Sequence, residues 1–337
     1  MATQQILQPV HPDFVDKLLP EYLAFHNANS LYAPNVHTLP WNPTVRQKPP
    51  VAGGSEPLKV GTVEDIALSK CTMRVFTPEG NPPSEGWPVF LFFHGGKNFR
   101  GWTLGNINTE NAFSTNMCKR ANCVVVSVDY RLGPEEPYPA AVEDAVEALR
   151  WIYEKGKERL RVNVQKFAVG GSSSGANLAA VITHKAALMT PSISLTFQVL
   201  VVPVVDNTAT SSRDPYPSWK ENANTVSLVP DKMIWFRKNY SPNEEDWTKW
   251  DNSPIFAPEE TFKKCPNAWI GVAELDILRD EGIAYGEKLR KAGAEVETRV
   301  YLGSPHPIMA MDGVLEVGRQ LVSDAAEALG KAFANNS

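Results

Sequence analysis

An apolar run passes directly into a glycine- and serine-rich turn at Phe167-Ala168-Val169-Gly170-Gly171-Ser172-Ser173-Ser174-Gly175-Ala176-Asn177. The run is typical of a buried strand, and the alanine-rich residues 175–187 predict a helix. The turn between them has the pattern G-x-S-x-G, in which only Ser173 has glycine two positions away on both sides. A strand–turn–helix of this kind exposes a serine hydroxyl at a sharp turn, and its glycines permit close approach of neighbouring backbone. Ser173 is therefore the predicted nucleophile, and Ser172 and Ser174 are neighbours that lack the full pattern.

Strands and helices alternate on both sides of this turn. Strand patterns cover two segments within 59–76 and the segments 88–93, 123–128, 167–171, 195–205, 268–273 and 295–302, and helix patterns cover 140–154, 175–187, 280–292 and 314–334. Continuous apolar runs such as 89–93 suit strands that are buried on both faces of a parallel sheet. The alternation predicts an α/β fold with a mainly parallel central sheet flanked by helices.

Two segments depart from the alternation. Residues 1–55 are rich in proline and asparagine with one helical pattern at 12–27, and residues 206–264 lack a strong strand but contain several tryptophans. An insertion this long is unusual in a compact domain unless it has a function or forms a subdomain. We expect 1–55 and 206–264 to form a helical cap over a catalytic domain made of 56–205 and 265–337. The alternative is a packed structural excursion with no role in the site.

Composition excludes several classes of protein. The chain has 337 residues, 43% hydrophobic and 21% charged, and its net charge of -5 argues against a nucleic-acid binder. No apolar run is long enough for a membrane-spanning helix, and residues 1–20 lack the pattern of a secretory signal. The four cysteines form no C-x-x-C and have no histidine at metal-ligand spacing. Reduced thiols, a cytoplasmic location and no metal site are expected.

A serine nucleophile needs a base and a group that orients the base. His306 follows the predicted strand 295–302, and Asp276 follows the predicted strand 268–273. Parallel α/β sheets assemble their sites at the carboxyl ends of strands, so both residues are well placed to meet Ser173. The chain order Ser, Asp, His is that of α/β-hydrolases. Three further acids compete with Asp276 for the orienting role: Glu274, Asp280 and Glu281.

The chain resembles the hormone-sensitive-lipase-like carboxylesterases of the α/β-hydrolase fold. Four blocks between residues 60 and 325 carry the resemblance: His94-Gly95-Gly96, Asp129-Tyr130-Arg131-Leu132-Gly133-Pro134-Glu135 with Pro139-Ala140-Ala141, Gly171 to Asn177, and Asp276-Ile277-Leu278-Arg279-Asp280-Glu281-Gly282 with Pro305-His306. The resemblance implies a Ser173/Asp276/His306 triad, a helical cap and no cofactor. It also implies a structural role for 129–141, and an oxyanion hole formed by the backbone N–H groups of Gly95, Gly96 and Ser174.

The sequence differs from the family pattern at the first and third blocks. The family usually has a third glycine directly after His-Gly-Gly, whereas here Lys97-Asn98-Phe99-Arg100 precede Gly101. We interpret these four residues as an insertion that can disturb the oxyanion hole. Ser172 stands where the family usually has an acidic residue, and Ala176 where it has glycine. These two changes can alter hydrogen bonds of the turn, but the nucleophile remains.

These observations predict a serine carboxylic-ester hydrolase that acts on short to medium acyl esters or lactones through an acyl-enzyme. The tryptophan-rich part of 206–264 and the N-terminal helix predict an apolar, partly covered pocket for a small-molecule ester. A small-molecule receptor and a non-hydrolytic biosynthetic enzyme on the same scaffold are the alternatives. A homodimer is the oligomer to test.

Overall fold

The computed structural model describes residues 5–47, 53–96, 101–212 and 215–335, built on an eight-stranded sheet of order β1-β2-β4-β3-β5-β6-β7-β8. The strands are β1 (Thr62–Ala67), β2 (Thr72–Thr77), β3 (Trp87–Phe93), β4 (Val124–Asp129), β5 (Val162–Ser172), β6 (Phe197–Val201), β7 (Asn267–Leu275) and β8 (Val296–Pro305). The β1–β2 and β2–β4 pairs are antiparallel, and all the other pairs are parallel. The predicted mainly parallel sheet is confirmed.

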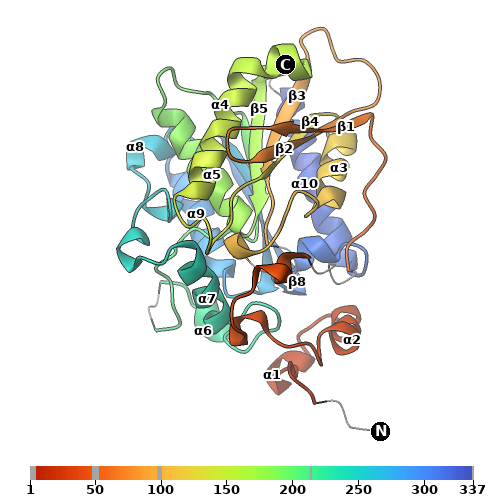
Figure 1. The fold of residues 1–337 in the computed structure, drawn as a ribbon, viewed down its shortest axis with the longest axis vertical. Helices are drawn as coiled ribbons and strands as arrows, with labels where there is room; N and C mark the ends of the chain where they lie inside the picture. Colours follow the sequence, from red (N-terminus) through yellow and green to blue (C-terminus); the bar gives the residue numbers. More distant parts are fainter. Residues whose placement is uncertain (1–4, 48–52, 97–100, 213–214, 336–337) are drawn as a thin grey trace.

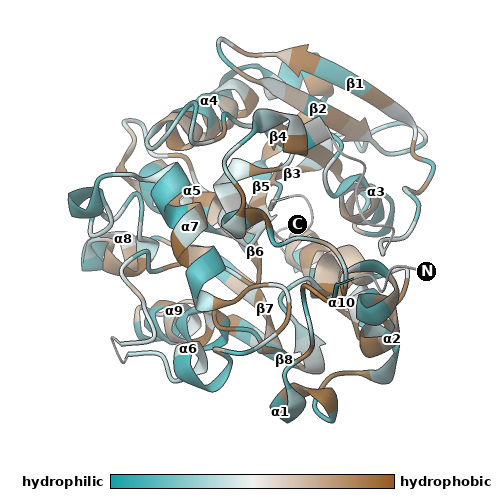
Figure 2. Ribbon diagram, turned by 60° about the horizontal axis from the view of Figure 1, so that its bottom comes forward, coloured by the Kyte–Doolittle hydropathy of each residue, from teal (hydrophilic) through white to brown (hydrophobic). Residues whose placement is uncertain are grey.

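Helices cover both faces of the sheet (Figures 1 and 2). They are α1 (Pro12–Val15), α2 (Pro20–Asn29), α3 (Asn111–Arg120), α4 (Ala140–Leu160), α5 (Ser174–Leu188), α6 (Ser218–Glu221), α7 (Pro230–Tyr240), α8 (Glu259–Phe262), α9 (Arg279–Lys291) and α10 (Glu316–Asn335). One apolar core lies between the sheet and α4, α5 and α9, and the other lies between the sheet and α3 and α10. Successive residues of β3 alternate between them, with Leu91 in the first core and Phe92 in the second. This explains the unbroken apolar run of that strand.

The N-terminal segment differs from the prediction of one helix over 12–27. The structure has two short helices, α1 and α2, and Pro20 is the first residue of α2. Proline lacks an N–H group and its ring clashes with a preceding helical turn, so it can begin a helix but not continue one. The apolar side chains of Phe14, Leu18 and Tyr22 are nevertheless buried together. The sequence analysis also missed α3, whose ten residues are mostly polar.

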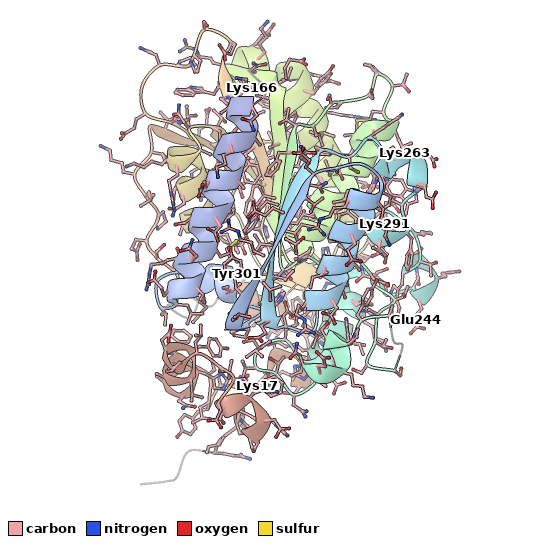
Figure 3. The ribbon with its side chains drawn as sticks, turned by 180° about the vertical axis from the view of Figure 1, so that it is seen from behind. Lys17, Lys166, Glu244, Lys263, Lys291 and Tyr301 are labelled. Atoms are coloured by element: carbon pink, nitrogen blue, oxygen red, sulfur yellow. The ribbon has the colours of Figure 1, made fainter. Side chains whose placement is uncertain are left out.

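The carboxyl ends of the parallel strands face the N-terminal helices. Figure 3 shows Lys166, near the start of β5, at one end of the molecule and Lys17, close to α1, at the opposite end. Tyr301 of β8 donates a hydrogen bond to Asp324 of α10 (2.6 Å), which links the last strand to the last helix. Among the described residues, we find no helix long and apolar enough to cross a membrane.

Candidate active site

Ser173 occupies a sharp turn between the end of β5 and the start of α5. Its backbone has φ 52° and ψ -114°, a conformation that non-glycine residues rarely adopt. The Ser173 N–H donates to the carbonyl of Val201 in β6 (2.8 Å), and its own carbonyl accepts the N–H of Asn177 in α5 (3.1 Å). These bonds fix the turn from both sides. The side chain of Ser173 is partly exposed, whereas Ser172 and Ser174 are buried.

The two glycines of G-x-S-x-G permit backbone contacts that no other residue allows. A Cβ on Gly171 would lie 2.6 Å from the backbone nitrogen of Ala176, and one on Gly175 would lie 2.5 Å from the carbonyl oxygen of His94. Both atoms belong to rigid backbone, which cannot move aside as a flexible side chain could. The motif therefore packs the first turn of α5 directly against the ends of β3 and β5.

Ser173, His306 and Asp276 form one chain of hydrogen bonds. His306 Nε2 lies 3.0 Å from Ser173 Oγ, and His306 Nδ1 lies 2.6 Å from Asp276 Oδ2. Ser173 directly follows β5, Asp276 directly follows β7 and His306 directly follows β8. The structure thus brings together the three residues that the sequence analysis selected, at the carboxyl edge of the sheet.

The competing acids have other partners. Glu274 Oε2 accepts the N–H of Gly303 (2.7 Å), so this acid holds the segment that leads to His306. Asp280 accepts the N–H of Ser218 (2.7 Å). Glu281 accepts the N–H of Val205 (2.9 Å) and the indole N–H of Trp219 (3.0 Å). Each of these carboxylates organises a loop around the site and does not contact the imidazole.

The three predicted oxyanion donors differ in their surroundings and in whether the backbone N–H group already has an acceptor. Gly96 lines a cavity of about 30 Å³ together with Ser173 and His306. Ser174 is the first residue of α5, where backbone N–H groups have no acceptor inside the helix. The Gly95 N–H, however, donates to Glu110 Oε2 (3.0 Å) and is not available to a substrate oxygen in this geometry. The prediction for Gly95 therefore needs correction. The predicted insertion Lys97–Arg100 lies outside the described residues.

Glu110 is a half-buried acid that the sequence analysis missed. It immediately precedes α3 with φ 63°, and its Oε1 accepts the hydroxyl of Ser172 (2.6 Å). Burial raises the pKa of this carboxyl to about 7, and the hydrogen bonds from Ser172 and Gly95 oppose that rise. Other titratable groups surround it: Tyr130 after β4, His306 after β8, and His26, Glu56, Lys232 and Asp312 in an adjoining cavity.

We expect the Glu110 carboxyl to make stability fall as the pH rises from about 4.5 to about 7. In that window the folded protein holds a proton that the unfolded chain releases, so raising the pH favours unfolding by on the order of 2–3 kcal/mol. Urea unfolding of the wild type and Glu110→Gln across this range measures the effect, because the other groups titrate in both proteins. The free-energy difference should move in favour of the Gln variant as the pH rises. A difference that is independent of pH would contradict the assignment.

A larger cavity of about 580 Å³ adjoins the small one at Ser173. Both cavities share the lining residues Gly96, Glu110, Met309 and Ala310. The walls of the larger cavity come from α2, residues 53–57, the start of α3, the segment after His306, and Ser227 and Lys232. Many lining groups are amides, hydroxyls or charged side chains. The cavity beside the serine site is thus of mixed polarity.

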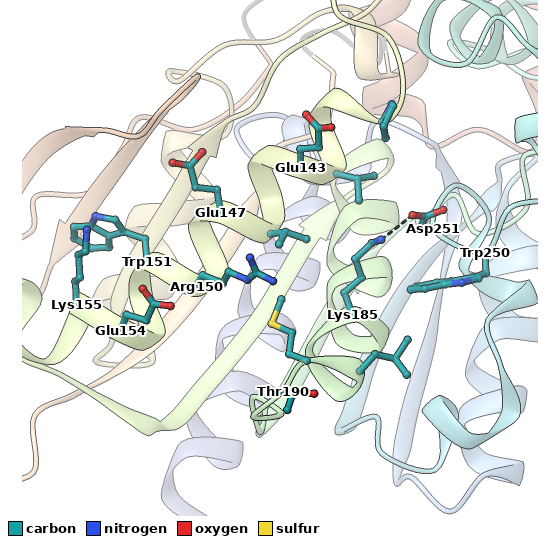
Figure 4. A pocket seen from close by; sticks show the side chains of 15 residues that line it. Glu143, Glu147, Arg150, Trp151, Glu154, Lys155, Lys185, Thr190, Trp250 and Asp251 are labelled. Atoms are coloured by element: carbon teal, nitrogen blue, oxygen red, sulfur yellow. Dashed lines mark hydrogen bonds and ion pairs between the residues drawn. The ribbon is translucent and has the colours of Figure 1, made fainter.

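The tryptophans of 206–264 do not line this pocket, contrary to the sequence prediction. Trp219 is buried and donates to Glu281, and Trp235 packs against Trp41 with ring centroids 6.0 Å apart. Trp250 lines a separate groove of about 960 Å³ between α4 and α5 (Figure 4), where Lys185 pairs with Asp251 (2.7 Å). The number of aromatic residues in 206–264 therefore does not indicate a pocket, because these rings mainly attach the segment to other parts of the chain, as Trp219 does at Glu281 and Trp235 at Trp41.

The described arrangement defines an α/β-hydrolase, with a nucleophile turn after one parallel strand and an acid and a histidine after later strands. Residues 90–310 match a family model described as alpha/beta hydrolase fold. The chain is 46% identical over 345 residues to the AB hydrolase superfamily protein C1039.03 of Schizosaccharomyces pombe. This alignment covers 99% of each of the two proteins. It is 36% identical over 259 residues to Esterase LipI of Mycobacterium tuberculosis, covering 76% of each.

Solved structures agree with this classification. The structure of LAE6, an α/β-hydrolase enzyme from the metagenome of Lake Arreo, aligns with a TM-score of 0.82 and 28% identity, covering 95% of this chain and 99% of the other. The chain belongs to the hormone-sensitive-lipase-like carboxylesterase family of α/β-hydrolases, and it is a carboxylic ester hydrolase.

Proposed function

We propose that this protein hydrolyses esters by nucleophilic attack of Ser173, with His306 as the general base and Asp276 as the group that orients it. The observation that carries the proposal is the continuous hydrogen-bond chain from Ser173 Oγ through the His306 imidazole to Asp276. An unassisted serine hydroxyl is a weak nucleophile, and an adjacent base overcomes that weakness.

The positions of these atoms support the following mechanism. His306 Nε2 takes the proton of Ser173 Oγ while the oxygen attacks the ester carbonyl, and Asp276 stabilises the resulting imidazolium through Nδ1–H. The N–H groups of Gly96 and Ser174 are the proposed donors to the carbonyl oxygen as it becomes negative. His306 then gives its proton to the leaving alcohol. Water activated by the same imidazole releases the acid from the acyl-enzyme.

We also propose that residues 1–55 and 206–264 act together as a cap. Tyr22 of α2 and Ser227 are joined by a hydroxyl–hydroxyl hydrogen bond of 2.8 Å, and both residues line the 580 Å³ cavity. Asp312, which follows the His306 loop, accepts hydrogen bonds from the backbone and hydroxyl of Ser55. These contacts support a cover that is formed by the two segments and attached next to the histidine.

The size and polarity of the cavity support short to medium acyl esters or lactones as substrates. A cavity of 580 Å³ accommodates a small ester. Its lining is partly polar, so a long acyl chain would gain less apolar contact there than in a wholly apolar pocket. A cytoplasmic location and a homodimer also remain predictions from the sequence.

A phosphonate probe and a series of p-nitrophenyl esters test these proposals together. We expect a p-nitrophenyl phosphonate to form a covalent adduct on Ser173, since the activated hydroxyl attacks phosphorus as it attacks an ester carbonyl, and the P–O bond to p-nitrophenolate breaks as the Oγ–P bond forms. Mass spectrometry of peptides locates the adduct, and Ser173→Ala is the unlabelled control. The ratio kcat/KM should be highest for acyl chains of about two to eight carbons and should fall for longer ones.

Two results would contradict the proposal. Binding of the probe without an adduct on Ser173 would favour the receptor alternative. Labelling of Ser173 without hydrolysis of any ester in the series would favour a non-hydrolytic reaction in the same pocket. A preference for long acyl chains would overturn only the proposed substrate class.

A further inference from the structure

Glu110 connects the loop after β3 with the nucleophile turn after β5, two segments whose relative position matters for the proposed reaction. Its Oε2 accepts the N–H of Gly95, in the loop after β3, and its Oε1 accepts the hydroxyl of Ser172, the residue before the nucleophile. One carboxyl group therefore bridges the glycine loop and the nucleophile turn. Glu110 and Ser172 are 62 residues apart in the chain.

The bridge is closely packed. A Cβ on Gly95 would lie 2.5 Å from Ser172 Oγ and 3.2 Å from Glu110 Oε1, so only glycine lets these three groups meet. Glu110 and Ser172 also line the small cavity at Ser173, next to Gly96. His94 adds a further restraint, because its Nδ1–H donates to the Gly95 carbonyl (2.7 Å). Its own carbonyl accepts the hydroxyl of Tyr130 (2.7 Å).

We propose, on the basis of the proposed esterase reaction, that Glu110 is a positioning residue that holds the Gly95 N–H and, through Ser172, aligns the Gly96 N–H with the nucleophile turn. Glu110 does not contact the reacting atoms in this role. A donor to an oxyanion is effective only when its direction is fixed before the reaction. The carbonyl-type oxygen of an amide can also accept the Gly95 N–H, so glutamine preserves this part of the bridge.

The proposal predicts a particular kinetic pattern. Glu110→Ala should lower kcat for a short p-nitrophenyl ester by about 10- to 100-fold and change KM by less than about threefold, because the lost alignment affects mainly the transition state. Affinity for a boronic acid that forms a tetrahedral adduct on Ser173 should fall by a factor similar to that of kcat/KM. Affinity for the product acid should stay within about twofold. Glu110→Gln should recover most of the lost kcat.

Glu147 provides a matched control. It also accepts a backbone N–H and a hydroxyl, both from Ser69 (2.9 and 2.6 Å), and it lines the groove of Figure 4, which shares no described lining residue with the cavity at Ser173. Glu147→Ala should leave kcat and boronic-acid affinity unchanged. If it lowers both as Glu110→Ala does, the effect is one of general stability and the proposal is wrong.

The remaining outcomes are also decisive. Wild-type kcat and boronic-acid affinity in Glu110→Ala would overturn the positioning role while leaving the esterase proposal intact, since the wild type would still hydrolyse esters and react at Ser173. A wild type without ester hydrolysis would overturn both. If Glu110→Ala does not fold, Ser172→Ala decides. Parallel losses of kcat and boronic-acid affinity of about 3- to 10-fold support the bridge, and unchanged values overturn it.

Discussion

Ser173→Ala should lower kcat/KM for short p-nitrophenyl esters by about 10⁴- to 10⁶-fold, because the variant lacks the oxygen that forms the acyl-enzyme. The fold should be preserved. The Ser173 side chain has one hydrogen-bond partner among the described residues, His306 Nε2 at 3.0 Å, and is partly exposed. Circular dichroism and thermal unfolding of the two proteins check this. Steady-state hydrolysis across several enzyme concentrations measures the residual rate.

The double variant Ser173→Ala/His306→Ala is the sharper control. Residues that act as a unit show strongly non-additive losses, so removing His306 from the Ser173→Ala protein should cost less than about tenfold more. Hydrolysis by Ser173→Ala within tenfold of the wild type would disprove the assigned nucleophile. If His306→Ala lowers kcat/KM by the same factor in the wild type and in the Ser173→Ala protein, the losses are additive. That result would indicate that Ser173 and His306 act in separate steps.

Gly175→Ala should destabilise the protein by about 4 kcal/mol or more, or prevent folding. The added Cβ would overlap the carbonyl oxygen of Phe93 and lie 2.5 Å from that of His94. Both carbonyls are at the end of β3, which pairs with β4 and β5 in the middle of the sheet, so they cannot shift without disturbing those strands. Equilibrium unfolding in urea measures the loss.

Gly330→Ala is the matched control for this steric argument. Gly330 is also in a helix, α10, but a Cβ there would lie 3.7 Å from the nearest atom, in ordinary contact with Ala121. Alanine has the higher helix propensity, so this variant should be up to about 1 kcal/mol more stable than the wild type. A similar small gain for Gly175→Ala would show that the close packing of the nucleophile turn is not needed.

Local patterns were sufficient for most of the fold. Alternating apolar runs and helical periodicity located the strands of the sheet and the long helices, since each pattern lies within a short stretch of chain. Two predictions about helices were wrong, the single N-terminal helix over 12–27 and the absence of a helix at α3, and each error has a physical reason. Pro20 divided the expected N-terminal helix, although its apolar residues still pack together. The polar helix α3 has a weak apolar pattern, and it is stabilised by packing against α10.

Sequence spacing also indicated Ser173, Asp276 and His306, because each directly follows a strand and parallel strands end at the same edge. It could not indicate the partner of Ser172. The family's usual acid at that position is replaced here by a hydroxyl, and the carboxyl group comes from Glu110 in another loop.

By itself, the sequence determined the strands of the sheet and the longer helices, the glycines of the nucleophile turn, and Ser173 and His306 with a short set of acids that included Asp276. These depend on residue type and on spacing within short segments. Only the tertiary structure decided that the Gly95 N–H binds Glu110, and that a pocket of mixed polarity lies beside Ser173. Such features arise where distant loops meet, and the burial and direction of a polar group there depend on the whole set of neighbours.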